Sequence, residues 1–209
     1  MTIDGIHVVT DAQLVPGRSH MDIARAAVEA GAPVLQLRDK SLPDGEFYEI
    51  ALALRKLTQG SGTLFVVNDR VDVAMAVGAD GVHVGQSDMP AGVTRRLIGN
   101  DRILGVSAST IEEAVAAAQD GPDYIGFGPI FTTATKTDAA AATGIEQMKK
   151  LKCLLTIPVV AIGGIGESNI EAVALAGADA VAVVSAVACA DDLRSAIKRL
   201  SGLFRTAAG

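Results

Sequence analysis

The stretch LFVVNDRVDVAMAVGADGVHV, residues 64 to 84, contains the pattern that decides the fold of this chain. It begins with a short, mostly apolar run, Leu64 to Asn68, which has the length and β-branched composition of a buried strand. A helix-length segment from Val71 to Val77 follows, and Gly78 is the residue type that most readily ends a helix in the left-handed conformation. A second apolar run begins at Gly81. This order predicts a strand, a helix and a second, parallel strand.

The same unit recurs along the chain, and the punctuation Gly78-Ala79-Asp80 is echoed by Gly31-Ala32-Pro33 and Gly177-Ala178-Asp179. Roughly eight such units predict an α/β protein, a single (β/α)₈ TIM barrel, with residues 1–209 forming one catalytic domain. The predicted strands are Ile6–Thr10, Val34–Arg38, Leu64–Asn68, Gly81–Val84, Ile103–Ser107, Tyr124–Phe127, Val159–Ile162 and Ala180–Val184. The predicted helices include Met21–Ala30, Gly45–Thr58, Val71–Val77, Ile111–Gln119, Ile145–Leu151 and Ser168–Ala176.

The composition fits a parallel sheet that is buried on both faces and argues against several classes of function. Hydrophobic residues make up 49% of the chain, Trp is absent, and small branched side chains suit such strands. A net charge of −6 opposes an extended nucleic-acid surface. The longest nearly apolar stretch, Ala180 to Ala190, is too short to cross a bilayer, and the start of the chain lacks a signal-peptide pattern. We therefore expect a cytoplasmic protein with neither nucleic-acid nor membrane partners.

The two cysteines, Cys153 and Cys189, lie far apart and show no CxxC spacing or nearby histidine pattern. Neither a disulfide framework nor a zinc site is therefore predicted, and both are expected to be reduced core residues. The sequence leaves the oligomeric state open, a homo-oligomer included.

Cationic side chains follow two of the predicted strands. In a barrel of this kind the active site lies at the carboxyl ends of the strands. Arg38 offers a planar fork for two phosphate oxygens, while Lys40 and Lys136 offer compact charges, so together they could neutralise a diphosphate. The alternative is that Arg38-Asp39-Lys40 is only a solvated charged turn.

Asp69 and Asp88 are candidate metal ligands, because they follow neighbouring predicted strands. Mg²⁺ prefers one or two carboxylates together with water and substrate phosphate oxygens. Each aspartate could instead cap a helix, Asp69 the one that starts near Arg70 and Asp88 the one that starts near Pro90.

The last two strands are followed by candidate phosphate-binding loops. Gly163-Gly164-Ile165-Gly166 follows the seventh strand, and Ser185 follows the eighth at the start of a predicted short helix. Backbone N–H groups at a helix start attract a phosphate, and glycine lets the backbone approach it, although such glycines can also merely tighten a turn. The longest connection, Gly128 to Thr143, is a candidate lid.

Histidines give a weaker signal. His83 lies within a predicted strand, where a packed structural role is favoured over contact with a substrate, and His7 and His20 have still less context. No Ser-His-Asp or Cys-His arrangement is apparent, which disfavours hydrolysis by a protein nucleophile.

Seven motifs, in this order and spacing, resemble the thiamine phosphate synthase family over almost the whole chain. They are QLRDK (36–40), NDR (68–70), GVHVGQSD (81–88), GPIF (128–131), TATK (133–136), IGGI (162–165) and VVSA (183–186). The resemblance implies a Mg²⁺-dependent transferase. In that family, diphosphate leaves a pyrimidine methylene and the nitrogen of a thiazole phosphate attacks the resulting cation.

The resemblance also implies a role for each matched position. The residues implied to contact the pyrimidine diphosphate are Gln36, Arg38, Lys40, Asn68, Ser107 and Lys136, with Asp69 and Asp88 holding Mg²⁺. The residues implied to hold the thiazole phosphate are Thr133, Thr135, Gly164, Val184 and Ser185. Arg38, Lys40 and Lys136 would stabilise the charge on the departing diphosphate. A valine at Gly164 would then selectively weaken binding of the thiazole phosphate.

Two features depart from the family pattern, and two rival functions stay open. Thr132 stands where the family usually has proline, and the predicted first strand begins almost at the start of the chain. The related thiazole tautomerases handle only the thiazole phosphate and have no need of Arg38, Lys40, Asp69 and Asp88. A phosphate-binding regulatory barrel without catalysis is the other rival. The sequence does not decide between the aromatic thiazole and a carboxylated precursor as the acceptor.

Overall fold

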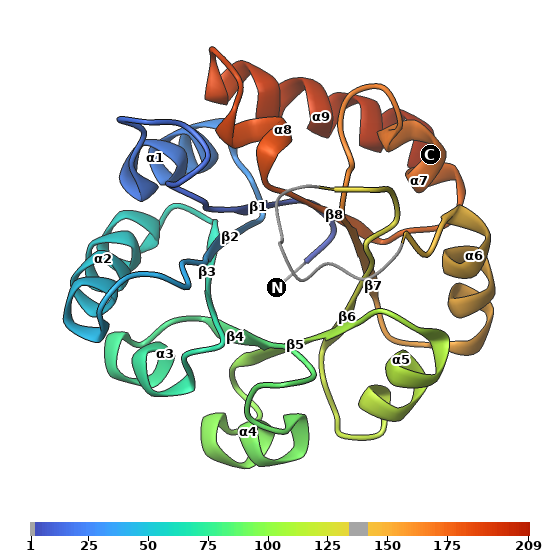
Figure 1. Ribbon diagram of the computed structural model, residues 1–209, viewed down its shortest axis with the longest axis horizontal. Helices are drawn as coiled ribbons and strands as arrows, with labels where there is room; N and C mark the ends of the chain where they lie inside the picture. The colour runs from blue at the N-terminus through green and yellow to red at the C-terminus, as the bar shows by residue number, and fades with distance from the viewer. Residues whose placement is uncertain (1–2, 134–141) are drawn as a thin grey trace.

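The computed structural model describes residues 3–133 and 142–209. Eight parallel strands in these residues close into a barrel, each paired with its neighbours in sequence and the last paired with the first. Helices surround the barrel on its outside (Figure 1). The predicted (β/α)₈ barrel is confirmed. The strands are β1 Gly5–Val9, β2 Val34–Leu37, β3 Leu64–Asn68, β4 Gly81–Val84, β5 Ile103–Ala108, β6 Tyr124–Phe127, β7 Val159–Ile162 and β8 Ala180–Val183.

The helices follow the strands as predicted, with one substantial addition. They are α1 His20–Ala30, α2 Asp44–Thr58, α3 Val71–Val77, α4 Ala91–Ile98, α5 Ile111–Ala118, α6 Ile145–Leu154, α7 Ile170–Leu175, α8 Ser185–Ala188 and α9 Leu193–Ala208. The addition is α9, which packs against α1 and α7 and so joins the last unit of the ring to the first (Figure 1). Its apolar stripe includes Ile197, Leu200 and Phe204, all buried.

Glycine ends two of the helices in the predicted way. Gly31 and Gly78 have left-handed backbone angles, φ +72° and +66°, at the ends of α1 and α3. Each donates its backbone N–H to carbonyls of the last turn, which would otherwise lack partners. The chain can therefore turn sharply from each helix into the following strand.

The strands are buried on both faces, because their side chains alternate between the barrel interior and the helix layer. The larger cluster of buried apolar side chains lies between barrel and helices and includes Val8, Leu35 and Phe65. A smaller cluster fills the interior with Val9, Ile103, Tyr124, Val160, Ala180 and Ala182, and the partly buried Ile3 packs against it. The interior is thus a packed core below the carboxyl ends of the strands.

Three aspartates hydrogen-bond to the amino-terminal ends of the strands. Two of them, Asp80 and Asp179, are the aspartates of the repeated Gly-Ala-Asp sequence. Each precedes an even-numbered strand and accepts hydrogen bonds from a backbone N–H at the start of the preceding strand and from a basic side chain on the helix before that strand. Asp80 pairs with Phe65 and Arg55, Asp123 with Leu104 and Arg95, and Asp179 with Val159 and Lys152. Pro33 stands at the corresponding place before β2.

Asp80→Ala is expected to lower the free energy of unfolding by about 1–3 kcal/mol, because the Phe65 N–H loses its acceptor and Arg55 its partner. Urea denaturation of Asp80→Ala beside Asp101→Ala, a variant at an exposed position, measures this loss. Equal stability of the two variants would mean that these hydrogen bonds have no energetic role.

The expectation that both cysteines lie in the core is wrong. Cys153 and Cys189 are both free but exposed. Cys153 lies on the solvent side of α6, whose buried positions are Met148 and Leu151, and Cys189 follows the last residue of α8. No helix in the described part of the chain combines the length and apolar character that a membrane span requires.

Candidate active site

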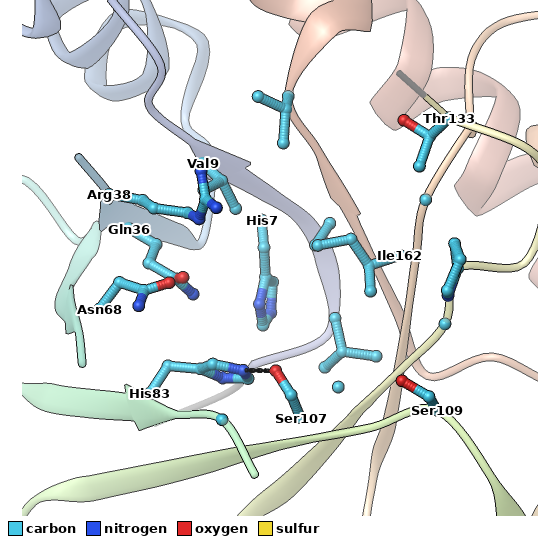
Figure 2. A pocket seen from close by; sticks show the side chains of 18 of the residues that line it. His7, Val9, Gln36, Arg38, Asn68, His83, Ser107, Ser109, Thr133 and Ile162 are labelled. Atoms are coloured by element: carbon cyan, nitrogen blue, oxygen red, sulfur yellow. Dashed lines mark hydrogen bonds between the residues drawn. The ribbon is translucent and has the colours of Figure 1, made fainter. Parts of the chain in front are cut away.

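A cavity of about 280 Å³ opens at the carboxyl ends of the strands. Side chains from opposite sides of the barrel face it (Figure 2). Every predicted site residue that falls within the described chain lines it: Gln36, Arg38, Lys40, Asn68, Asp69, Asp88, Ser107, Thr133, Gly164, Val184 and Ser185. Thr135, Lys136 and much of the predicted Gly128–Thr143 lid lie outside the described residues.

Arg38 lies on the β2 side of the cavity, near Gln36 and Asn68 (Figure 2). Its backbone N–H donates to the Thr10 hydroxyl at 3.2 Å. The Arg38 Nε atom is buried and has no hydrogen-bond partner within the described part of the chain. A buried donor without an acceptor is costly, and a phosphate oxygen is an acceptor suited to a guanidinium. The orphaned Nε therefore indicates an anion site.

Asp39 stabilises the loop that carries Arg38 and Lys40 through hydrogen bonds, and it does not itself line the cavity. The Asp39 carboxylate accepts hydrogen bonds from the backbone N–H of Ser41 and Leu42 and lies 3.1 Å from His20 Nε2. Burial acts to raise the pKa of Asp39, but these hydrogen bonds outweigh it and the pKa is lowered. Arg38-Asp39-Lys40 is therefore an anchored turn that presents its two cations beside the cavity.

Asp69 and Asp88 bring two carboxyl groups together at the ends of β3 and β4. Burial, followed by the hydrogen bond and negative charge of Asp88, raises the pKa of Asp69 to about 6. The Lys40 ammonium, 3.6 Å from Asp69 Oδ2, acts in the opposite direction but does not cancel the rise. Two carboxylates held this closely repel one another unless a proton or a cation lies between them.

Local backbone geometry, and not helix capping, accounts for both aspartates. Asp69 has φ +62°, a left-handed angle that aspartate tolerates better than most residues, and the cap position of α3 is Arg70. The Asp88 carboxylate accepts from the Gly85 N–H at 2.7 Å. A Cβ at Gly85 would lie only 2.8 Å from Asp88 Oδ2, so a larger residue there would displace the Asp88 carboxylate from its present position. Neither α3 nor α4 has a side-chain cap, and the capping alternative is wrong.

The donor set at Asp69 and Asp88 fits Mg²⁺. Among the described residues, no group of three or more His, Cys, Asp or Glu side chains could enclose a metal. Two adjacent carboxylates beside a phosphate site are nevertheless what Mg²⁺ uses when substrate and water complete its shell. Burial and, after it, the neighbouring Asp88 raise the pKa of Asp69, and a divalent cation would offset both by stabilising the charged carboxylates.

The metal-free protein should lose stability as the pH rises from about 4 to about 6. In this window folded Asp69, with a pKa of about 6, holds a proton that the unfolded chain releases near its usual 3.8. The shift corresponds to at most about 3 kcal/mol, and solvent screening of a side chain that is 21% exposed reduces the effect to about 1–2 kcal/mol. Asp69→Asn should therefore stabilise the metal-free protein at pH 7.5 and have little effect at pH 4. Urea denaturation in a chelator at both pH values tests this, and equal shifts at both would contradict it.

The glycine loop after β7 lies on the far side of the cavity from Arg38. Gly163 and Gly164 have φ +99° and +65°. A Cβ at Gly164 would lie 2.7 Å from the Thr132 carbonyl oxygen and 2.8 Å from Phe131 Cβ. These glycines let the loops after β6 and β7 pack against each other. A valine at Gly164 would thus strain both loops, so its effect on binding of the thiazole phosphate, which stays a prediction, would be accompanied by an effect on loop packing.

The other phosphate candidate, Ser185, is placed as the sequence predicts. The short helix α8 begins at this residue, directly after Val184. Arg18, in the loop after β1, donates to the carbonyls of Ala188 and Ala190 at the other end of α8. The helix is therefore tied to the rest of the barrel rim with its first turn beside the cavity.

The lower part of the cavity contains polar side chains that the sequence analysis did not assign to the site. His83 is central among them, and its ring lies beside Ser107 (Figure 2). His7 and Tyr124 also line the cavity and are almost fully buried. The detectable signal was the alternation of the strands, since these residues share the inward face with Val9, Gly126 and Ser107.

The fold and the cavity define a class of enzyme, the TIM barrels that act on phosphate-containing substrates at the carboxyl ends of their strands. The family model described as thiamine monophosphate synthase matches residues 6–187. The chain belongs to this family.

Individual relatives agree with the family match. The thiamine-phosphate synthase of Chloroflexus aurantiacus is 52% identical over 95% of this chain and 91% of its own length. That of Moorella thermoacetica is 46% identical over 98% of this chain and 97% of its own. The solved structure of thiamine phosphate pyrophosphorylase from Pyrococcus furiosus superposes with a TM-score of 0.89 at 42% identity, over 98% of this chain and 97% of that one.

Proposed function

We propose that this protein is a thiamine phosphate synthase, a transferase that joins a pyrimidine-methyl diphosphate to a thiazole phosphate and releases diphosphate. The observation that carries the proposal is the pairing, in one cavity, of the orphaned Arg38 guanidinium with the Asp69 and Asp88 carboxyl pair. A diphosphate bound with a divalent cation satisfies both at once.

The two sides of the cavity suit the two substrates. Gln36, Arg38, Lys40, Asn68 and Ser107 are assigned to the pyrimidine diphosphate, and Asp69 and Asp88 to Mg²⁺. Thr133, Gly164, Val184 and Ser185 are assigned to the thiazole phosphate. Thr135 and Lys136 complete the two sets as proposed contacts outside the described residues. Support for the division comes from the positions of these residues, because cations and carboxylates gather at β2 to β4 and the glycine loop and α8 at β7 and β8.

The proposed reaction needs no protein nucleophile. The bond between the methylene carbon and the diphosphate oxygen breaks, its electron pair leaves with the diphosphate, and the thiazole nitrogen forms the new bond to that carbon. Arg38 and Lys40 stabilise the charge that grows on the diphosphate. When bound, Mg²⁺ supplies further neutralisation of the same oxygens. Gly164 and Ser185 hold the thiazole phosphate so that its ring nitrogen faces the carbon.

The rival functions are not favoured. A thiazole tautomerase has no diphosphate to bind and so no use for the Arg38 and Asp69–Asp88 sites. A regulatory barrel without catalysis would not need two carboxyl groups held in repulsion. We further propose that the chain acts in the cytoplasm as one catalytic domain, without nucleic-acid or membrane partners. A homo-oligomer is compatible with this assignment.

The direct test is release of diphosphate by the purified protein, measured with each substrate alone and with both, with and without Mg²⁺. Release is expected only when both substrates and Mg²⁺ are present, together with stoichiometric formation of thiamine phosphate. Equal release without the thiazole phosphate would make the protein a diphosphate hydrolase. Isomerisation of a thiazole phosphate without diphosphate chemistry would support the tautomerase.

A further inference from the structure

A chain of three side chains runs through the lower part of the cavity. The Tyr124 hydroxyl lies 2.9 Å from His83 Nδ1, and His83 Nε2 lies 2.8 Å from Ser107 Oγ. The rings of His83 and Tyr124 lie 5.4 Å apart between centroids and are tilted by 33°. Ser107 is therefore joined through His83 to a tyrosine buried in the barrel interior.

Two glycines make room for this chain. A Cβ at Gly105 of β5 would collide with Tyr124 Cζ and His83 Nδ1, and one at Gly126 of β6 would lie 2.9 Å from His83 Cε1. Neither glycine has the positive φ that would explain its presence by backbone conformation. The barrel interior thus leaves space specifically for the His83 and Tyr124 rings.

The direction of the hydrogen bonds follows from the burial of Tyr124. Burial raises the pKa of the Tyr124 hydroxyl, with a smaller contribution from the charge of Asp123, so the hydroxyl keeps its proton. Within the described residues, the only hydrogen-bond partner of this hydroxyl is His83 Nδ1. A buried O–H without an acceptor costs on the order of 1–3 kcal/mol, so Tyr124 donates to Nδ1.

The remaining assignments follow in order. An Nδ1 that accepts a hydrogen bond carries no hydrogen, so the N–H hydrogen of the His83 ring resides on Nε2. His83 Nε2 therefore donates to Ser107 Oγ. No second protein acceptor for the Ser107 hydroxyl occurs in the part of the chain that the structure describes. Its own O–H is then directed to the cavity as a donor.

His7 does not introduce a charge that would reverse this order. Burial lowers the pKa of His7 to about 4, despite a hydrogen bond with the Ile3 carbonyl oxygen that acts to raise it. Since a carbonyl only accepts, neutral His7 donates from Nε2. Its ring meets Tyr124 edge to face, at 5.7 Å between centroids. The ring that packs against Tyr124 is thus an uncharged imidazole at neutral pH.

We propose that Tyr124 is a positioning residue which, through His83, holds the Ser107 hydroxyl as a hydrogen-bond donor toward the bound aromatic base. The cavity then favours a ring that presents a bare nitrogen to Ser107 over one that presents a C–H. The identity of that base as the pyrimidine of the diphosphate substrate rests on the proposed function. The direction of the hydrogen bonds from Tyr124 to His83 and Ser107 does not depend on the proposed function.

The first test uses nitrogen NMR of the substrate-free protein at neutral pH, with His83 assigned by comparison with His83→Gln. Nδ1 of His83 is expected at the frequency of an unprotonated imidazole nitrogen, and Nε2 at that of a protonated one. In Tyr124→Phe the preference should weaken or reverse, whereas Tyr48→Phe, at the other tyrosine of the chain, should leave it unchanged. A protonated Nδ1 in the parent protein would overturn the proposal, even if Tyr124→Phe failed to fold.

The second test measures binding by calorimetry with Mg²⁺. Tyr124→Phe should weaken binding of the pyrimidine diphosphate about tenfold, which corresponds to the loss of one hydrogen bond. The affinity for the thiazole phosphate should stay unchanged. An analogue with C–H in place of the ring nitrogens should bind the parent protein and Tyr124→Phe equally. If Tyr124 had only a structural role, Tyr124→Phe would weaken the binding of all three ligands together, and this result would overturn the proposal. The NMR result needs no substrate, so a lack of diphosphate release by the parent protein would count against the proposed function only.

Discussion

Replacing Asp69 and Asp88 together with asparagine is expected to lower kcat on the order of 10³-fold and to abolish the response of the enzyme to Mg²⁺. Both side chains keep their size, and asparagine tolerates the left-handed backbone angle of residue 69. What changes is charge, because two neutral amides no longer attract a divalent cation. The departing diphosphate would then depend on the proposed cations Arg38, Lys40 and Lys136 without a metal ion.

Steady-state kinetics over a Mg²⁺ titration, with calorimetry of Mg²⁺ binding, measures this effect. Asp101→Asn serves as the control, since residue 101 is exposed and lies outside the cavity lining. The double variant should be at least as stable as the parent in the absence of metal, because the burial of the Asp69 charge and its repulsion by Asp88, which raise the pKa of Asp69, no longer act. Loss of activity with intact folding would separate metal binding from structure. Unchanged kcat in the double variant would falsify the metal assignment.

The fold was predictable from sequence because each unit contains local signals that agree. The segment Leu64–Val84 shows this: β-branched runs predict the strands, and Gly78 ends the helix with the positive φ that glycine allows. The structure adds what no local pattern shows. Asp80 was read as punctuation before a strand, and its contacts with Phe65 and Arg55 depend on the closing of the barrel.

The site was predictable where its residues lie near the carboxyl ends of the strands or in the loops that follow, and not where they lie deeper in the strands. Arg38, Asp69 and Asp88 stand in polar loops, where barrel geometry directs attention. His7 and Tyr124 are embedded in apolar strands, where alternation groups them with other residues of one face but does not show that this face lines the cavity. For such residues the partner on a neighbouring strand decides the role.

At Cys153 and Gly164 the residue type alone gives an incomplete picture, for one physical reason. Cys153 was expected in the core from its residue type, yet its position on the surface of α6 decides its exposure. Gly164 was considered only as a phosphate contact, yet its missing Cβ also makes room for Phe131 and the Thr132 carbonyl. In both cases the packing of neighbouring elements overrides the preference of the residue type.

Arg38→Met is expected to lower kcat/KM on the order of 10²-fold or more while the protein remains at least as stable as the parent. The guanidinium contributes little to folding, because its buried Nε has no hydrogen-bond partner within the described residues. Methionine fills much of the same volume without that unsatisfied donor. The loss should therefore fall on the diphosphate, which is the acceptor that the Arg38 site lacks.

Arg38→Lys makes the prediction specific to the shape of the guanidinium. Lysine keeps the positive charge but lacks the planar fork and the Nε donor, so it should recover only a small part of the lost activity. Arg205→Met, on the exposed side of α9, controls for the loss of an arginine as such and should behave as the parent does. Both substrates should be tested by calorimetry, and only the pyrimidine diphosphate should bind more weakly. Full activity in Arg38→Lys would reduce the site to a simple charge, whereas marked destabilisation of Arg38→Met would mean that the guanidinium supports the fold and that its unpaired Nε is no sign of a ligand.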